Sequence, residues 1–191
     1  MRHLSEEKRQ LILAAALECF LHSGPKKTSM GQVARIAGLA TGGIYLYYRD
    51  KDHLVQETAL QFAEVHRLRV RDILDSPEAA DEKLRAYVLE RFDVWEKLSG
   101  PGLVEFTAAV LKSSGESLQK DTENWFRSIE GLLTEGVRTK LFRRLDVKRD
   151  AEIFLLAIMG FFPMPGLANP NRPGRAQLLK LVEWFIEQWR S

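Results

Sequence analysis

The stretch TSMGQVARIAGLATGGIYLYYRDK, residues 28–51, decides the fold of the first part of the chain. Ser29 is a good helix N-cap, and Gln32 three residues later completes a capping box that satisfies two free backbone donors. Small and apolar side chains then recur at the spacing of one buried helix face: Val33, Ala34 and Ala37. Gly38 stands where a left-handed residue ends a helix. The sequence therefore predicts a short helix that ends in a tight turn.

A second helix is predicted to begin at about Thr41. Ile44 and Tyr48 lie four residues apart and share its buried face. Two adjacent glycines, Gly42 and Gly43, occupy its first turn, where each costs about 1 kcal/mol relative to alanine. Two short helices joined by a tight turn are typical of a helix-turn-helix, whose second helix contacts DNA. The alternative is a strained linker helix in an ordinary helical bundle.

The opposite face of this second helix consists of Gly42, Gly43 and Leu46. Tyr45 and Tyr47 flank this face with their hydroxyl groups. A helix N-terminus has free N–H groups and the positive end of the helix dipole, so it favours anions. The two tyrosine hydroxyls add hydrogen-bond donors. We therefore expect this surface to contact DNA phosphates.

A long motif resembles the N-terminal domain of the TetR family of bacterial transcriptional regulators: ILAAALECFLHSGPKKTSMGQVARIAGLATGGIYLYYRDKDHLV, residues 12–55. The matching features keep several fixed spacings: Ala-Ala-Leu-x-x-Phe ending at Phe20, then Gly24, the Thr28-Ser29 cap, Val33-Ala34-x-x-Ala37-Gly38, Tyr45, Tyr48, and the exit from Lys51 to Leu54. The motif covers about a quarter of the chain, and the rest matches only in length and helical character. The resemblance implies an all-α fold of about nine helices, with an N-terminal three-helix helix-turn-helix DNA-binding domain and a C-terminal helical domain for ligand binding and dimerisation.

The resemblance also implies a set of DNA-contacting residues: Thr28, Ser29, Thr41, Gly42, Tyr45, Leu46, Tyr47 and Lys51. The sequence departs from the family at Gly31, where other members present a side chain that can read a base, and at Ala40, which replaces a common serine. Leu46 offers only apolar contact, for instance to a thymine methyl group. We therefore expect the spacing of half-sites and DNA shape to carry much of the specificity.

Composition and charge agree with this interpretation. The 191 residues are 45% hydrophobic and 28% charged, which is typical of a soluble globular protein. Residues 1–51 hold eight Lys and Arg against four Asp and Glu, although the net charge of the whole chain is only +2. A basic N-terminal part on a nearly neutral body is typical of a DNA reader attached to another module.

The single cysteine, Cys19, excludes an internal disulfide and is typical of the reducing cytoplasm; its place beside Phe20 predicts a buried structural thiol. The N-terminus MRHLSEEKRQ lacks the apolar core of a signal peptide, and no apolar run approaches the ~20 residues of a membrane span. We expect a cytoplasmic protein without a membrane partner.

We predict two domains: a helix-turn-helix DNA-binding domain over 1–51 and a helical effector-binding and dimerisation domain over 52–191, linked by a helix over 51–76. Apolar periodicity predicts the other helices at 6–22, 77–98, 103–111, 117–140, about 147–162 and 175–190. No strand pattern or internal repeat is present in the sequence.

Helix-turn-helix proteins usually read two half-sites about one helical turn apart, which requires a two-fold partner. The last two predicted helices carry the candidate residues of a homodimer interface: Phe154, Leu155, Ile158, Met159, Val182, Phe185 and Trp189. Their stripes could instead belong to the internal core. These two helices also resemble the pair that forms the dimer in the TetR family.

The resemblance implies a small-molecule effector that releases DNA by changing the separation of two DNA-binding domains. The candidate pocket residues lie on the middle helices, with two polar anchors: Phe92, Trp95, Phe106, Trp125 and Phe162, with Glu105 or His66. The aromatic residues favour an apolar or flat aromatic ligand, although each of them could be plain core. Glu105 could equally form a surface salt bridge, and His66 could be a packing residue.

An enzyme is the competing class, but the sequence does not support one. The four histidines show no metal-binding spacing such as HExxH, and GxGxxG, P-loop and GxSxG motifs are absent. We expect no cofactor and no metal. The remaining alternative is an all-helical adaptor whose C-terminal domain binds a protein partner. We predict a ligand-responsive transcriptional regulator, acting as a repressor, that binds a palindromic DNA operator as a homodimer and is released by a small hydrophobic effector.

Overall fold

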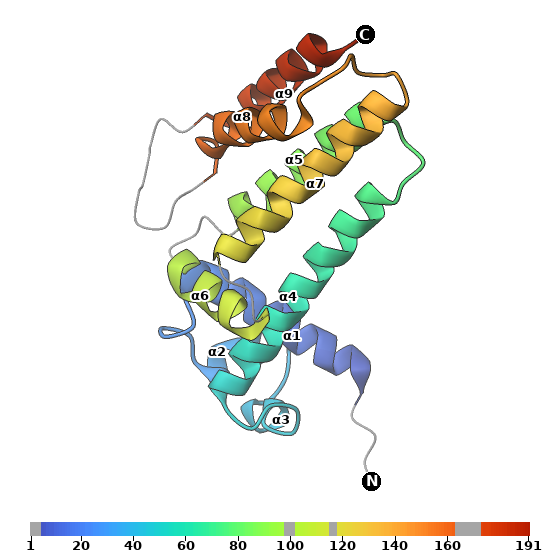
Figure 1. The fold of residues 1–191 in the computed structure, drawn as a ribbon. Helices are drawn as coiled ribbons and strands as arrows, with labels where there is room; N and C mark the ends of the chain where they lie inside the picture. The colour runs from blue at the N-terminus through green and yellow to red at the C-terminus, as the bar shows by residue number, and fades with distance from the viewer. Residues whose placement is uncertain (1–4, 98–101, 115–117, 163–172) are drawn as a thin grey trace. The chain divides into compact units, whose positions relative to one another are not determined.

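The computed structural model describes residues 5–97, 102–114, 118–162 and 173–191. In these ranges the regular structure is helical, apart from an isolated bridge between Phe142 and Arg190. The helices are α1 (Glu6–Ser23), α2 (Met30–Ile36), α3 (Thr41–Ile44), α4 (Lys51–Leu74), α5 (Ala80–Lys97), α6 (Leu103–Ser114), α7 (Leu118–Arg138), α8 (Val147–Met159) and α9 (Arg175–Trp189) (Figure 1). The predicted all-α fold is confirmed.

The chain divides into two compact units. The N-terminal unit comprises residues 1–65 and 97–116, and the C-terminal unit comprises residues 66–96 and 117–191. Helix α6 therefore belongs with α1, α2, α3 and the first part of α4, although it follows α5 in the chain. The functional boundary at residue 51 stays a prediction.

Helix α1 supplies a large part of the core of the N-terminal unit. The Lys8 N–H donates to the Ser5 hydroxyl at 3.4 Å, and the helix ends at Gly24, whose φ of +81° favours glycine. The side chains on its buried side are apolar: Ile12, Leu13, Ala15, Ala16, Cys19 and Phe20. Leu11 is exposed because the buried side of the helix runs through residues 12, 16 and 19.

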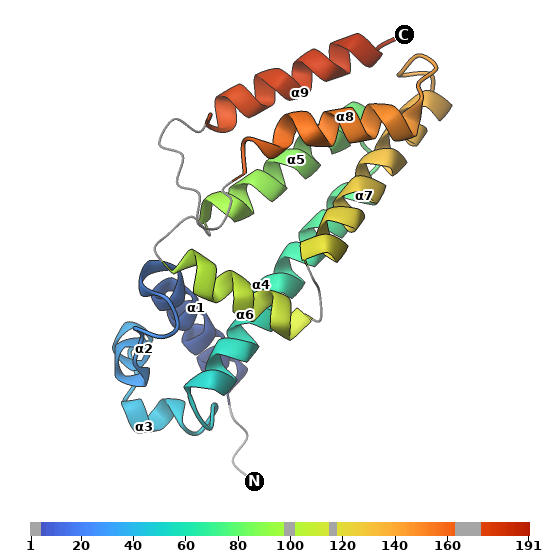
Figure 2. The same cartoon turned by 60° about the vertical axis from the view of Figure 1, so that its left-hand side comes forward.

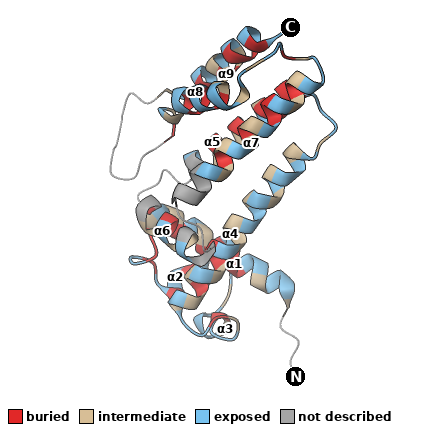
Figure 3. Cartoon of the chain, in the orientation of Figure 1, coloured by how far each residue is buried: buried red, intermediate tan, exposed pale blue. Residues whose placement is uncertain are grey.

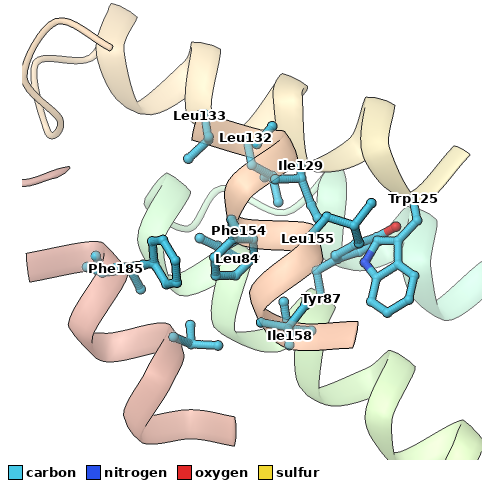
Figure 4. Packing of buried hydrophobic residues seen from close by; sticks show 14 of the residues in the cluster. Leu84, Tyr87, Trp125, Ile129, Leu132, Leu133, Phe154, Leu155, Ile158 and Phe185 are labelled. Carbon is cyan, nitrogen blue, oxygen red and sulfur yellow. The ribbon is translucent and has the colours of Figure 1, made fainter. Parts of the chain in front are cut away.

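One apolar core fills the C-terminal unit, with contributions from α5, α7, α8 and α9 (Figures 3 and 4). Phe154 of α8 meets Phe185 of α9 edge to face, with ring centroids 5.1 Å apart. Phe142, which follows α7, packs against Trp189 at 5.9 Å. Such aromatic pairs add about 0.5–1.5 kcal/mol to the free energy gained by burying apolar area.

Ion pairs join α5 to its neighbours at the edge of this core. Arg85 donates two hydrogen bonds to Glu183 of α9, with Nε 2.5 Å from Oε1 and Nη2 2.9 Å from Oε2. Lys83, which is buried, donates to Glu135 of α7 at 3.0 Å. Because the Arg85 pair is bidentate, it fixes the orientation of α5 on α9 as well as the distance between them.

The predicted long helices are all present, with ends that differ from the predictions by no more than three residues. The second helix of the helix-turn-helix is the exception, because α3 is only one turn long. Within the described part of the chain, no helix combines the length and the apolar character that a membrane crossing requires.

Candidate nucleic-acid interface

The first helix of the predicted motif is capped as the sequence indicates. The Gln32 N–H donates to the Ser29 hydroxyl at 3.2 Å, and the Ser29 N–H donates to the Gln32 side-chain oxygen at 2.7 Å. At the other end Gly38 has φ +67°, and the Leu39 N–H bonds to the carbonyl of Ala34 at 2.9 Å. The capping box and the glycine-terminated turn are confirmed.

Helix α3 has one buried side and one open side. Ile44 and Tyr48 are buried, as predicted from their spacing. Tyr45 and Leu46 are 51% and 60% exposed. A Cβ added at Gly42 would meet nothing within 4 Å, so this surface is open to the approach of another molecule. The predicted second helix gives way after Ile44 to a turn, which still presents Tyr45 and Leu46 outward.

The predicted DNA contact of Thr28 needs a correction. Its side chain is only 3% exposed, and its hydroxyl donates to the carbonyl of Gly24 at 2.8 Å. A buried and bonded hydroxyl cannot present itself to DNA. Thr28 therefore shapes the turn before α2 and is not a contact residue.

Lys51, the first residue of α4, also bonds inside the unit. Its ammonium group donates to the carbonyls of Lys26 and Thr28, both at 3.2 Å. An ammonium group has three donors, so one remains for another acceptor. The expected phosphate contact stays a prediction, and the structure adds a second role that the motif alone did not reveal.

Charged and aromatic side chains join α1 to α4. Arg9 donates to Glu57 at 2.7 Å, and the ring of His53 lies 5.6 Å from that of Tyr48. Burial raises the pKa of the Tyr48 phenol, although the neighbouring Arg9 opposes this effect. An open cleft of about 370 Å³ lies here, lined by Ser5, Glu6, Arg9, Tyr47, Tyr48, His53 and Glu57. Sequence reasoning missed Arg9 and Glu57, because their positions 48 residues apart carry no local pattern.

The predicted effector residues fall into separate groups. In the C-terminal unit, Phe162 packs against Trp125 at 4.6 Å and Phe92 at 6.1 Å, and the guanidinium of Arg91 lies 4.7 Å from the Trp125 ring centre. Among the described residues, the indole N–H of Trp125 is buried and has no hydrogen-bond partner. His66 lies in the same unit, 3.4 Å from Glu90.

Two other members of the predicted effector set pack in the N-terminal unit. Phe106 contacts Phe20 and Phe62, with ring centroids at 6.0 and 5.8 Å. Glu105 accepts a hydrogen bond from the Lys26 N–H at 3.1 Å. The side chain of Trp95 lies outside the described residues. The described members of the predicted effector set therefore do not form one cluster. Phe106 is a core residue of the N-terminal unit.

The predicted dimer residues also need a correction. Six of them are buried within the single chain: Phe154, Leu155, Ile158, Val182, Phe185 and Trp189. Met159 packs partly buried against the same core. These positions hold α8 and α9 to α5 and α7, as the internal-core alternative expected. Leu156 of α8 and Trp184 of α9 are instead 64% and 53% exposed.

No group of three or more His, Cys, Asp or Glu side chains in the described ranges is arranged to hold a metal ion.

A capped helix, a glycine turn and an exposed one-turn helix over a buried apolar side together define a helix-turn-helix protein.

Comparison with known proteins agrees with this class. Residues 12–58 match the family of bacterial regulatory proteins named the tetR family. The fatty acid metabolism regulator protein of Bacillus subtilis (strain 168) is 29% identical over 151 residues, which cover 74% of each chain. The regulator AcrR of Shigella flexneri is 42% identical over 53 residues, 28% of this chain and 25% of that protein.

Solved structures share the fold over nearly the whole length. A transcriptional regulator from Cytophaga hutchinsonii has a TM-score of 0.67 at 24% identity, covering 96% of this chain and 99% of that one. The ketosteroid transcriptional regulator KstR2 of Mycobacterium tuberculosis has a TM-score of 0.59 at 18% identity, covering 99% and 97%. The chain therefore carries the N-terminal domain of the TetR family over residues 12–58, and the relatives that it matches are transcriptional regulators.

Proposed function

We propose that this protein is a homodimeric repressor that binds a palindromic operator and is released by a small hydrophobic effector. The observation that carries the proposal is the open side of the helix-turn-helix, where Tyr45 and Leu46 project from a segment anchored by buried Ile44 and Tyr48. The proposed DNA contacts are Ser29, Thr41, Gly42, Tyr45, Leu46, Tyr47 and Lys51. This function places the protein in the cytoplasm, where the DNA of a bacterium lies.

Repression is supported by a relative. The transcriptional repressor KstR2 of Mycolicibacterium smegmatis is 28% identical over 89 residues, which cover 47% of this chain and 43% of that protein. A protein that covers its operator blocks access by other proteins. We therefore infer repression by occlusion of a promoter.

A two-fold dimer is supported by an apolar stripe on α8 that the core does not use. Its exposed members are small or apolar and recur at helical spacing: Ile153, Leu156 and Ala157 on α8, and Gly160 directly after it. Trp184 adds a large exposed ring on α9. Exposed apolar surface of this kind marks interaction sites, and a two-fold axis would pair the stripe with its copy. This stripe replaces the residues chosen from the sequence.

An apolar effector is supported by the aromatic cluster of Phe92, Trp125 and Phe162. The indole N–H of Trp125, which has no partner among the described residues, offers one hydrogen-bond donor to an acceptor on the effector. The names of two similar proteins refer to fatty acid metabolism and to a ketosteroid, both of which concern largely apolar molecules.

The first test is a selection of bound sequences from random DNA duplexes at about physiological salt. An enriched inverted repeat is the expected result. Tyr45→Ala should lose the enrichment, whereas the matched control Leu11→Ala, which removes an exposed side chain from α1, should keep it. Binding that depends on salt but not on sequence would overturn the proposal and favour the adaptor alternative.

A second step tests the effector. Fatty acids and steroids are added to the complex of protein and selected DNA, and release is followed by fluorescence anisotropy. Release by an apolar ligand is expected, and Trp125→Phe should weaken it because the donor is lost. If no apolar ligand releases DNA but a protein partner binds the C-terminal unit, the effector part of the proposal fails.

A further inference from the structure

The beginning of α6 lies against the end of α1 within the N-terminal unit, as Figures 1 and 2 both show. The contact is between backbones. A Cβ added at Gly102 would lie 2.0 Å from the carbonyl oxygen of Phe20 and 2.5 Å from the nitrogen of Gly24. Any side chain at this position would push the two segments apart, so the approach depends on glycine.

Three residues further along, Glu105 reaches the turn that connects α1 to α2. Its Oε2 accepts a hydrogen bond from the Lys26 N–H at 3.1 Å, and its Oε1 lies 3.6 Å from the Lys26 ammonium nitrogen. Next to it, Phe106 is fully buried against Phe20 and Phe62. Helix α6 is therefore anchored by apolar packing while its carboxylate holds the turn.

The same turn is also held by α4 and by its own side chains. Lys51 donates to the carbonyls of Lys26 and Thr28, and the Thr28 hydroxyl donates to the carbonyl of Gly24. The backbone of residues 24–28 is thus fixed by groups from α6, from α4 and from within the turn itself. The next residue, Ser29, is the N-cap of α2, so the position of the turn sets where the helix-turn-helix begins.

We propose that Gly102 and Glu105 are positioning residues for DNA binding. They hold residues 24–28, and through them the start of α2, in the arrangement that fits the operator. This assignment rests on the proposed DNA-binding function and replaces the expected role of Glu105 as an effector anchor.

The direction in which one substitution changes DNA affinity distinguishes this positioning role from a purely electrostatic effect. Glu105 places a negative charge beside the basic turn, so its removal would strengthen binding to DNA if charge alone mattered. The proposal expects the opposite for Glu105→Ala: DNA binding weakens about tenfold, the factor that corresponds to one lost charge-assisted hydrogen bond. Glu105→Gln keeps an oxygen that accepts from Lys26 but removes the charge, so it should bind at least as well as the wild-type chain.

The experiment measures affinity for the selected operator at fixed salt, thermal unfolding, and amide hydrogen exchange at Lys26 in the DNA-free protein. Glu105→Ala should speed exchange at Lys26 and lower affinity, and Glu105→Gln should do neither. Glu18→Gln, an exposed carboxylate on α1, is the control and should change nothing. Gly102→Ala should act like Glu105→Ala; because it could also disturb folding, the two Glu105 variants decide the outcome.

Wild-type or higher affinity of Glu105→Ala would overturn the proposal, as would a loss in Glu105→Gln equal to that in Glu105→Ala. The exchange measurement requires no DNA. If the wild-type protein selects no operator, the proposed function fails, whereas unchanged exchange at Lys26 in Glu105→Ala shows that the turn is not held by α6.

Discussion

The ammonium nitrogen of Lys51 lies 3.2 Å from the carbonyl oxygen of Thr28, so the first residue of α4 holds the end of the turn that precedes α2. The two residues are 23 positions apart in the chain. A lysine expected to contact phosphate therefore also joins the two ends of the helix-turn-helix. Its substitution should affect stability as well as DNA binding.

Lys51→Met should lower the free energy of unfolding by about 1 kcal/mol, because it keeps the aliphatic stem but leaves two carbonyls without their donor. Operator affinity should fall with it. Urea unfolding and gel shift at fixed salt measure the two effects. Lys27→Met is the control: it removes the positive charge of an exposed lysine, so it should lower DNA affinity through weaker attraction to phosphates and leave stability unchanged. Equal stability of the wild type and Lys51→Met would show that the bonds to the turn contribute nothing.

Tyr45→Phe should weaken operator binding by about 1 kcal/mol while leaving the protein folded, because it removes one exposed hydroxyl. Half of this side chain is exposed, so thermal unfolding should not change. Gel shift at fixed salt and a thermal scan check both parts. Wild-type affinity would count against this docking of the helix-turn-helix.

Leu156→Lys should convert the proposed dimer to monomers, because it places a charge in the centre of the exposed α8 stripe. Sedimentation velocity measures the change, and circular dichroism should remain that of the wild type. Phe154→Ala is the contrasting variant: this ring is buried in the chain's own core, so its loss should destabilise each chain by about 3–5 kcal/mol. A Leu156→Lys protein that remains dimeric would place the interface elsewhere.

Two glycines of α7 should respond to alanine in opposite directions. Gly131→Ala meets nothing within 4 Å and should stabilise the helix by about 0.5–1 kcal/mol. A Cβ at Gly136 would lie 2.1 Å from Cδ2 of Phe142, a buried ring, so Gly136→Ala should destabilise by about 1–3 kcal/mol. Chemical denaturation of both variants measures the difference, and the same sign for both would contradict the described packing.

The bond between Arg85 and Glu183 should make stability depend on acid pH. Hydrogen bonds from Arg85 lower the pKa of Glu183 below its ordinary value of 4.5. A lowered carboxyl pKa contributes stability above the unfolded value, and this contribution is lost as pH falls through the folded value. The wild-type advantage over Glu183→Gln should therefore shrink as the pH is lowered from neutral to below that ordinary value. Urea unfolding at several pH values tests this, and a constant difference would exclude the linkage.

The candidate DNA interface was largely predictable from local sequence. The Ser29–Gln32 capping box, the left-handed Gly38 and the buried pair of Ile44 and Tyr48 were all confirmed. Capping and helical periodicity act over a few residues, so they are readable without knowledge of the partners. The length of α3 was not predictable, because the same residues can continue a helix or leave it after one turn.

By itself, the sequence determined the all-α fold, the bounds of the long helices to within a few residues, and the helix-turn-helix. Only the tertiary structure decided which apolar stripe of α8 is core and which is exposed. Helix α8 is apolar on more than one side, and the side that is buried is the one that packs against the neighbouring helices. The tertiary structure also decided the contacts that Thr28 and Glu105 make. Glu105 bonds to a residue 79 positions away, and no local pattern encodes a contact at that distance.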